Sequence, residues 1–85
     1  MAVDLLYFGV LKDALGRDAE RIDPPSPVLT VADLIRWLGE RGPPYAEALS
    51  DPVRIGAAVD RGHAGLQDSF FGAREVALFP AESGL

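Results

Sequence analysis

The feature that most constrains the fold is a pair of short, wholly apolar runs, one near each end of the chain. Residues 5–8 and residues 76–79 are apolar at every position. Continuous runs of this kind are typical of strands covered on both faces, whereas strands with one wet face alternate apolar and polar residues. We therefore predict two strands covered on both faces, lying side by side and parallel at the centre of one sheet.

One clear helix is predicted between the two runs. Thr30 is a good N-cap, and Asp33 completes a capping-box pattern three residues later. Gly39 and then Gly42 end the helix. The apolar residues that recur at helical spacing along one side are Val31, Leu34, Ile35 and Leu38. A single amphipathic helix of this kind packs on one face of a sheet.

Shorter elements fill the rest of the chain. Leu66, Phe70 and Phe71 are expected to pack beneath a loop. The other predicted elements are a helical turn over 10–15 closed by Gly16, an edge strand over 19–22, a helical turn over 45–49, a strand over 55–59 and a turn over 60–62 in which the glycine takes the positive φ.

These elements predict an α+β fold, a ubiquitin-like β-grasp with one main helix packed on one face of a mixed sheet. A chain of 85 residues buries only about 60–65% of its unfolded surface, so its apolar segments must share one core. Residues 1–85 are accordingly interpreted as one domain, with residues 80–85 as an exposed C-terminal tail.

The charge of the chain restricts its partners. It has 8 basic and 13 acidic residues, a formal net charge of −5. The basic residues are dispersed, whereas phosphate binding needs them clustered, so we do not expect nucleic acid as a partner. An acidic surface suits a basic patch on another protein. The N-terminus lacks a signal-peptide pattern and no run approaches the ~18 apolar residues of a membrane span, so we expect a cytoplasmic protein with no membrane partner.

The sequence offers little for catalysis by this chain alone. Cysteine is absent, which excludes disulfides, thiol nucleophiles and thiolate metal sites. His63 is the only histidine and has no carboxylates at ligand spacing, so we interpret it as a surface turn residue and expect no metal site. Trp37 lies at the edge of the apolar stripe of the helix. It belongs either to the margin of the core or to a contact surface. We expect a protein that is not an enzyme by itself.

The last ten residues indicate another kind of working group. The strand over 76–79 stops at Pro80, and small and polar residues follow. A core strand that leads directly into a short terminus can present the chain's own carboxylate for reaction. The alternative is a frayed end without a function.

Four segments together resemble a known family. Residues 3–16 are similar to its opening strand and short helix, 30–34 to the start of its helix, 55–60 to its middle strand and 74–80 to its final strand. In this order and spacing the chain resembles the molybdopterin synthase small subunit, in the MoaD/ThiS family of ubiquitin-like sulfur carriers. The resemblance covers essentially the whole chain.

The resemblance implies that the function resides at the C-terminus. In that family an E1-like enzyme adenylates the terminal carboxylate with ATP, and a sulfur donor converts it to a thiocarboxylate. The tail enters the large catalytic subunit of molybdopterin synthase, which passes the sulfur to a pyranopterin precursor. The chain itself binds no cofactor, because ATP is used by the activating partner. Carried over to this sequence, the reacting end is Gly84 and Leu85, and the partner-binding residues are Phe79, Pro80, Ala81, Glu82 and Ser83.

The tail departs from the family pattern, which ends in two prolines, valine, serine and two glycines. Here residues 80–85 read Pro-Ala-Glu-Ser-Gly-Leu. Glycine lets the backbone pass a narrow channel because it has no Cβ, and the branched side chain of Leu85 should obstruct that passage. Either the terminus is trimmed to Gly84, or a partner accepts leucine, or carrier activity has been lost. Asp60 also stands where the family has asparagine.

Two alternatives to the molybdopterin pathway remain at this stage. The first is a sulfur carrier for another acceptor, in thiamine synthesis, cysteine synthesis or tRNA thiolation. The second is a β-grasp interaction module without carrier chemistry, which the altered tail favours.

Overall fold

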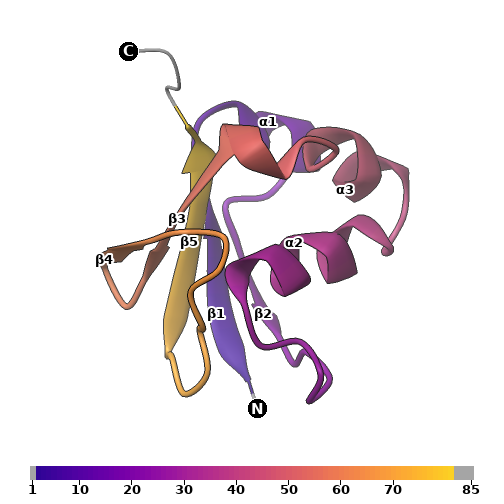
Figure 1. The fold of residues 1–85 in the computed structure, drawn as a ribbon. Helices are drawn as coiled ribbons and strands as arrows, with labels where there is room; N and C mark the ends of the chain where they lie inside the picture. The colour runs from indigo at the N-terminus through magenta and orange to yellow at the C-terminus, as the bar shows by residue number, and fades with distance from the viewer. Residues whose placement is uncertain (1, 82–85) are drawn as a thin grey trace.

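The computed structural model describes residues 2–81, which form one mixed sheet with helices packed against it (Figure 1). The predicted tail residues 82–85 lie outside the described residues. The elements are β1 Val3–Tyr7, α1 Val10–Leu15, β2 Ala19–Ile22, α2 Val31–Gly39, α3 Pro43–Ala48, the 3-10 helix η1 Pro52–Arg54, β3 Ile55–Val59, β4 Gly62–Ala64 and β5 Glu75–Pro80.

The two apolar runs form the central strands of the sheet. The strand order is β2-β1-β5-β3-β4. β1 and β5 are parallel, with Leu5 opposite Val76 and Tyr7 opposite Leu78. The other pairs among the described strands are antiparallel. The predicted α+β architecture, a β-grasp with its end strands paired in parallel, is confirmed.

The helices cover only one face of this sheet (Figure 1). In β1, Leu5 and Tyr7 are buried beneath them, whereas Leu6 between them is only partly buried. β5 alternates in the same way. Phe8 lies beyond the end of β1 and is 50% exposed. The prediction of strands covered on both faces is therefore wrong, because no helix of residues 2–81 lies over the second face.

The main helix α2 begins as the sequence predicts. The Thr30 hydroxyl accepts a hydrogen bond from the Asp33 N–H at 3.1 Å, and the Asp33 carboxylate accepts one from the Thr30 N–H at 3.2 Å. This reciprocal pair satisfies two N–H groups that the first helical turn leaves without partners. The residues of the predicted apolar stripe are all buried, namely Val31, Leu34, Ile35 and Leu38.

The turn after β3 is a tight hairpin rather than the glycine turn that we predicted. Asp60 and Arg61 have φ values of 50° and 72°, whereas Gly62 belongs to β4. Two consecutive residues in the left-handed region suit a two-residue hairpin, since their twist matches that of the flanking strands. The sequence did not predict β4. His63 lies in this strand, where it is exposed, and not in the turn.

The loop before β5 packs against the start of α2 through one of its two phenylalanines. Phe70 is completely buried, and its N–H donates to the Leu29 carbonyl oxygen at 3.0 Å. Leu66 is partly buried against the core. Phe71 is 73% exposed. The core prediction is therefore right for Phe70 and Leu66 and wrong for Phe71.

A partly buried carboxylate joins β1, β2 and α3. One oxygen of Glu20 accepts hydrogen bonds from the hydroxyls of Tyr7, at 2.6 Å, and Tyr45, at 2.9 Å. The other oxygen accepts from Arg17 and Arg41, each at 3.1 Å. Only 9% of the Glu20 side chain is exposed. These partners come from far apart in the sequence, so the cluster fixes how the strands and α3 meet.

Opposing effects set the charge state of this cluster. Burial pushes the pKa of Glu20 upward, but hydrogen bonds from Tyr7, Tyr45 and Arg41 outweigh it and leave that pKa below its ordinary value. Burial and the hydrogen bond to Glu20 both raise the pKa of Tyr7. Glu20 is therefore an anion at neutral pH, and Tyr7 is a neutral donor.

Leu34→Ala should lower the free energy of unfolding by roughly 2–5 kcal/mol, because it leaves a cavity where a fully buried side chain was. Urea denaturation followed by circular dichroism measures the change. Leu29→Ala is the matched control, since Leu29 is an exposed leucine outside the helix and should cost much less. Equal losses in the two variants would contradict the packing described here.

Glu20→Gln should lower the free energy of unfolding at pH 7 by about 1–3 kcal/mol, because hydrogen bonds to a charged acceptor are weakened. The folded-state pKa of Glu20 is depressed, so its stabilising contribution is present above the unfolded value of about 4.3 and is lost as the pH falls through the folded value.

The difference in urea midpoint between the wild type and Glu20→Gln should therefore shrink between pH 7 and pH values below about 4. Glu47→Gln, which changes an exposed carboxylate on α3, is the control and should have little effect at either pH. A wild-type advantage over Glu20→Gln that is independent of pH would contradict the role of the Glu20 charge.

Candidate functional site

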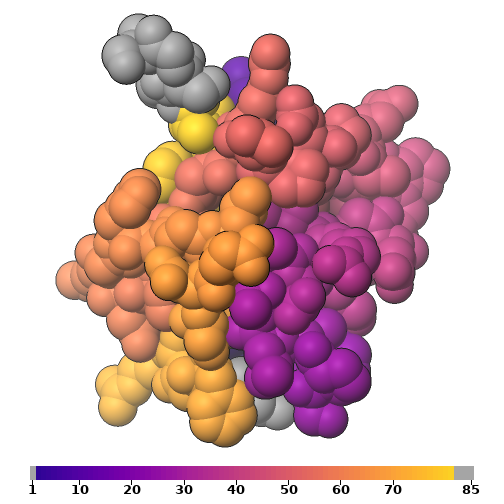
Figure 2. Space-filling view, in the orientation of Figure 1, coloured from indigo at the N-terminus to yellow at the C-terminus, as the bar shows by residue number. Residues whose placement is uncertain are grey.

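Three of the seven predicted site residues lie within the described chain. Phe79, Pro80 and Ala81 form the last part of β5 and the residue after it, and we call them the tail root. The predicted Glu82, Ser83, Gly84 and Leu85 lie outside the described residues. The Ala81 N–H donates to the Arg54 carbonyl oxygen at 2.7 Å, which extends the pairing with the β3 side of the sheet. Figure 2 shows the end of β5, in yellow, at the surface beside the segment around residues 50–55.

Phe79 lies on the open face of the sheet. It is paired with Gly56 of β3, and its ring lies across that glycine. The adjoining row of paired positions on the same face runs through the small or aliphatic residues Ala19, Leu6, Ala77 and Ala58 and ends at His63 of β4. We call this row, with Phe79 and Gly56, the docking face. It contains no Asp, Glu, Lys or Arg side chain.

Charged residues occupy the other end of the same sheet face. The Arg21 side chain donates to Asp4 at 2.9 Å across β1 and β2. Near the start of β5, Arg61 lies 3.7 Å from Glu75. Because these charges are paired with each other, the end next to the tail root is the part of this face suited to an apolar contact.

Exposed apolar side chains surround the tail root, and we call Phe8, Val10 and Val53 the collar. Val10 and Val53 are 66% and 74% exposed. Phe8 and Val10 flank the turn after β1, where the Phe8 N–H donates to the Leu78 carbonyl oxygen. Val53 precedes Arg54, the residue that holds Ala81. Exposed apolar groups clustered at one end of a small domain are typical of a protein interaction site.

A groove of about 300 Å³ lies on the helix side of the tail root. Arg54 contributes a side chain that is 78% exposed and lies 3.4 Å from Asp51. The remaining walls come from α1, α3 and the loop after it, β3 and the tail root. The lining residues are Val10, Leu11, Ala48, Ser50, Asp51, Arg54, Ile55, Pro80 and Ala81. The tail root therefore stands between this groove and the docking face.

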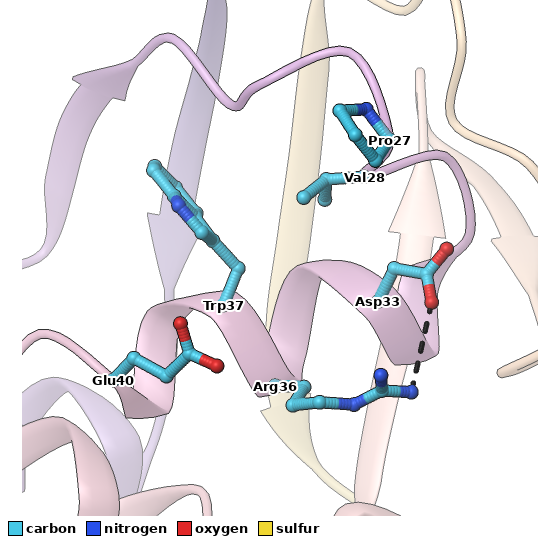
Figure 3. Close-up of a pocket in the computed structure, with 6 residues that line it drawn as sticks. All are labelled: Pro27, Val28, Asp33, Arg36, Trp37 and Glu40. Atoms are coloured by element: carbon cyan, nitrogen blue, oxygen red, sulfur yellow. Dashed lines mark ion pairs between the residues drawn. The ribbon is translucent and has the colours of Figure 1, made fainter.

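A second hollow, of about 180 Å³, lies between α2 and the loop before it (Figure 3). Trp37 rises from α2 toward the loop that carries Val28, and the Arg36 side chain lies 3.7 Å from Asp33. Trp37 is partly buried and packs against the core, which makes it a core-margin residue. The hollow shares no residue with the tail root and brings no nucleophile or acid–base pair together.

The described residues provide no other reactive constellation. Residues 2–81 contain no group of three or more His, Asp or Glu side chains placed to hold a metal ion. No helix in this part of the chain is long and apolar enough to cross a membrane. The site is thus a surface around the tail root rather than a catalytic pocket.

Asp60 holds the start of β5, at the end of the strand opposite the tail root. Its carboxylate accepts hydrogen bonds from the N–H groups of Arg74 and Glu75, at 2.9 and 3.1 Å. An asparagine carbonyl oxygen can accept the same bonds, and both residue types tolerate the left-handed backbone. The change from the family's asparagine therefore keeps the interaction that starts β5.

The fold and site define a class of protein: a ubiquitin-like β-grasp whose central C-terminal strand ends at an apolar surface. The chain matches the model of the ThiS family over residues 5–84. The chain therefore belongs to the ThiS family. A comparison with curated proteins gave no significant match.

Solved structures share this fold. SAMP1 from Haloferax volcanii has a TM-score of 0.70 and 23% identity over the full length of both chains. A putative molybdopterin converting factor, subunit 1, from Pyrococcus furiosus has a TM-score of 0.74 and 21% identity, covering 95% of this chain and 98% of that chain. These solved structures and this member of the ThiS family thus share one ubiquitin-like fold.

The sequence alone did not identify the residues around the tail root. Gly56 had a detectable signal, because a glycine inside an apolar strand often marks the close approach of another group. The collar had none, since Phe8 and Val10 look like core residues within apolar segments. The backbone contact between Arg54 and Ala81 depends on strand pairing, which residue types do not encode locally.

Proposed function

We propose that the chain is a sulfur-carrier subunit of a molybdopterin synthase. In this role an E1-like partner adenylates the C-terminal carboxylate, which displaces pyrophosphate from ATP. Hydrosulfide from the sulfur donor then displaces AMP, so that a C–S bond replaces the C–O bond to AMP and a thiocarboxylate is left. The large synthase subunit receives the tail and passes the sulfur to the pterin precursor.

One observation carries this proposal: the last strand of the chain is a central strand that ends within an apolar surface. A terminal carboxylate must be delivered into another protein's active site, so its base has to be rigid and its surroundings have to bind that protein. β5 is held between β1 and β3, and Ala81 is bonded to Arg54. The docking face and the collar supply the apolar contact, and the net charge of −5 favours a basic cleft.

Carriers for other acceptors use the same activated terminus, so they remain the alternative within this class. The resemblance to the Pyrococcus molybdopterin converting factor subunit and the overall length support the molybdopterin assignment. Sulfur transfer from the thiocarboxylated chain to a pterin precursor, in the presence of a large synthase subunit, tests the acceptor. Transfer to a thiazole precursor or to tRNA instead would reassign it.

Phe79→Ala should raise the Kd for a candidate large synthase subunit at least tenfold, because the truncated side chain is the largest on the docking face. Isothermal titration calorimetry measures this. Phe71→Ala is the matched control, since Phe71 is an exposed phenylalanine outside the docking face and collar and should leave the Kd unchanged. The association rate of the wild type should fall as salt is added.

Deletion of residues 82–85 separates the tail from the docking face in the same assay. We expect weaker binding, since the deleted residues include the part that enters the partner. Unchanged binding of the deletion variant would remove the tail from the interface. Equal losses for Phe79→Ala and Phe71→Ala would argue against the docking face.

The residue at position 85 should decide how well the terminus is activated. Overpacking a fitted channel costs ~1–3 kcal/mol, so a chain ending in Leu85 should be thiocarboxylated about ten- to a hundredfold more slowly than Leu85→Gly. A chain ending at Gly84 should be intermediate, because it lacks the obstruction but is one residue short.

Each protein is incubated with an activating enzyme, ATP and a sulfur donor, and intact-mass spectrometry detects the exchange of one oxygen for sulfur. Full conversion of the chain ending in Leu85 would show that leucine is accepted. Failure of all three proteins with an enzyme that modifies its own carrier would favour an interaction module without carrier chemistry.

A further inference from the structure

We propose that Gly56 is a specificity-determining residue of the docking face. Its missing side chain lets the Phe79 ring lie across β3, and the ring in that position is the platform on which an apolar side chain of the partner packs. Gly56 acts through Phe79 and is therefore a positioning residue. The inference rests on the proposed carrier function, because the docking face adjoins the tail root.

The space above Gly56 is occupied by the Phe79 ring. A Cβ built on Gly56 would lie 2.3 Å from Cε1 of Phe79 and 2.9 Å from both Cδ1 and Cζ. Carbon atoms in contact are normally separated by about 3.5–4.0 Å, so a side chain at position 56 and the ring in its present place are incompatible. Gly56 has no positive φ, so space rather than backbone conformation requires glycine here.

A glycine in a strand interior has a cost that the ring offsets. Glycine destabilises a strand relative to alanine, through backbone entropy and the lack of a side chain to pack. An aromatic ring on the paired strand can cover such a glycine. Gly56 and Phe79 are direct partners in the antiparallel pairing of β3 with β5.

The clash that a Cβ would create can be relieved by the ring alone. The atoms involved belong to an aromatic side chain on the open face, which can rotate away from the sheet without moving the backbone. Alanine at position 56 should therefore preserve the fold and change the docking face, with the ring raised from β3. This separation of effects is what makes Gly56 a determinant of recognition.

The second contact of the tail root limits where the ring can go. Gly9 has a φ of 60°, and a Cβ on it would lie 3.1 Å from two ring atoms of Pro80. Pro80 is thus seated on the turn after β1, while Phe79 is seated on β3. Because the backbone of both residues stays in place, a displaced Phe79 ring must project outward, where it would meet the partner.

The inference fits one kind of partner surface, a protein with an aliphatic or aromatic side chain that packs on the Phe79 ring. The small residues beside Phe79, such as Ala58 and Ala77, allow such a side chain to approach the sheet closely. A raised Phe79 ring would project above these small residues and prevent that close approach. The expected result is a loss of affinity without a loss of stability.

The first measurement needs no partner. In the wild type, the Phe79 ring should shift the NMR resonances of the Gly56 α-protons, and Phe79→Ala should abolish that shift. Unchanged α-proton resonances in Phe79→Ala would overturn the inference at its structural step.

The second measurement is a double-mutant cycle on partner binding. Gly56→Ala should raise the Kd for the large synthase subunit about tenfold with little change in urea midpoint. Gly39→Ala is the matched control, because a Cβ there meets nothing within 4 Å, and it should leave the Kd unchanged. In the Phe79→Ala background, Gly56→Ala should have no further effect, since neighbours that act through each other are not additive.

The remaining outcomes are each decisive. An unchanged Kd for Gly56→Ala, or the same tenfold loss with and without Phe79, would overturn the role of Gly56 while leaving the carrier function in place. No binding by the wild type, with the ring shift present, would instead overturn the proposed function and the partner platform with it.

Discussion

The parallel pairing of β1 with β5 is the constraint on which the rest of this molecule depends. Parallel neighbours run in the same direction, so the end of the last strand lies beside the end of the first. The turn after β1 therefore meets the tail root, where Pro80 lies against Gly9, the residue between the collar residues Phe8 and Val10. A parallel pair also needs a long crossover. Residues 8–74 provide it, and they carry every helix that covers the sheet in the described chain.

The apolar runs over residues 5–8 and 76–79 seemed to require cover on both faces of the sheet, but the helices cover only one. Residues such as Leu5 and Leu78 build the core, whereas Leu6, Ala77 and Phe79 lie on the face without helices. Folding alone does not require apolar residues there, because a strand with one wet face can carry polar ones. These additional apolar residues on the open face are what contact with a partner protein would require. Under the proposed function, the misread pattern marks the surface for a second protein, since a continuous apolar run cannot distinguish a second layer of the same chain from a second protein.

Local signals made much of the fold predictable. The capping box at Thr30, the apolar stripe of α2 and the prolines after β2 act within a few residues, and each gave the right element. The Glu20 cluster was not predictable, because Tyr7, Tyr45 and Arg41 reach it only after the sheet and α3 are assembled. The same limit applies to the site. The tail root was found from its sequence position, but its contacts with Gly56 and Arg54 are products of strand pairing.

The departures from the family pattern at Asp60 and at Leu85 concern different properties of the protein, its folding and its chemistry. Asp60 replaces an asparagine yet keeps the acceptor that holds the start of β5, so the body of the domain retains its geometry. Every residue of the described core lies between Val3 and Leu78. Under the proposed function, recognition and chemistry are separated along the chain: we propose that the Phe79 ring and Gly56 select the partner, while the residue at position 85 sets how readily that partner activates the chain.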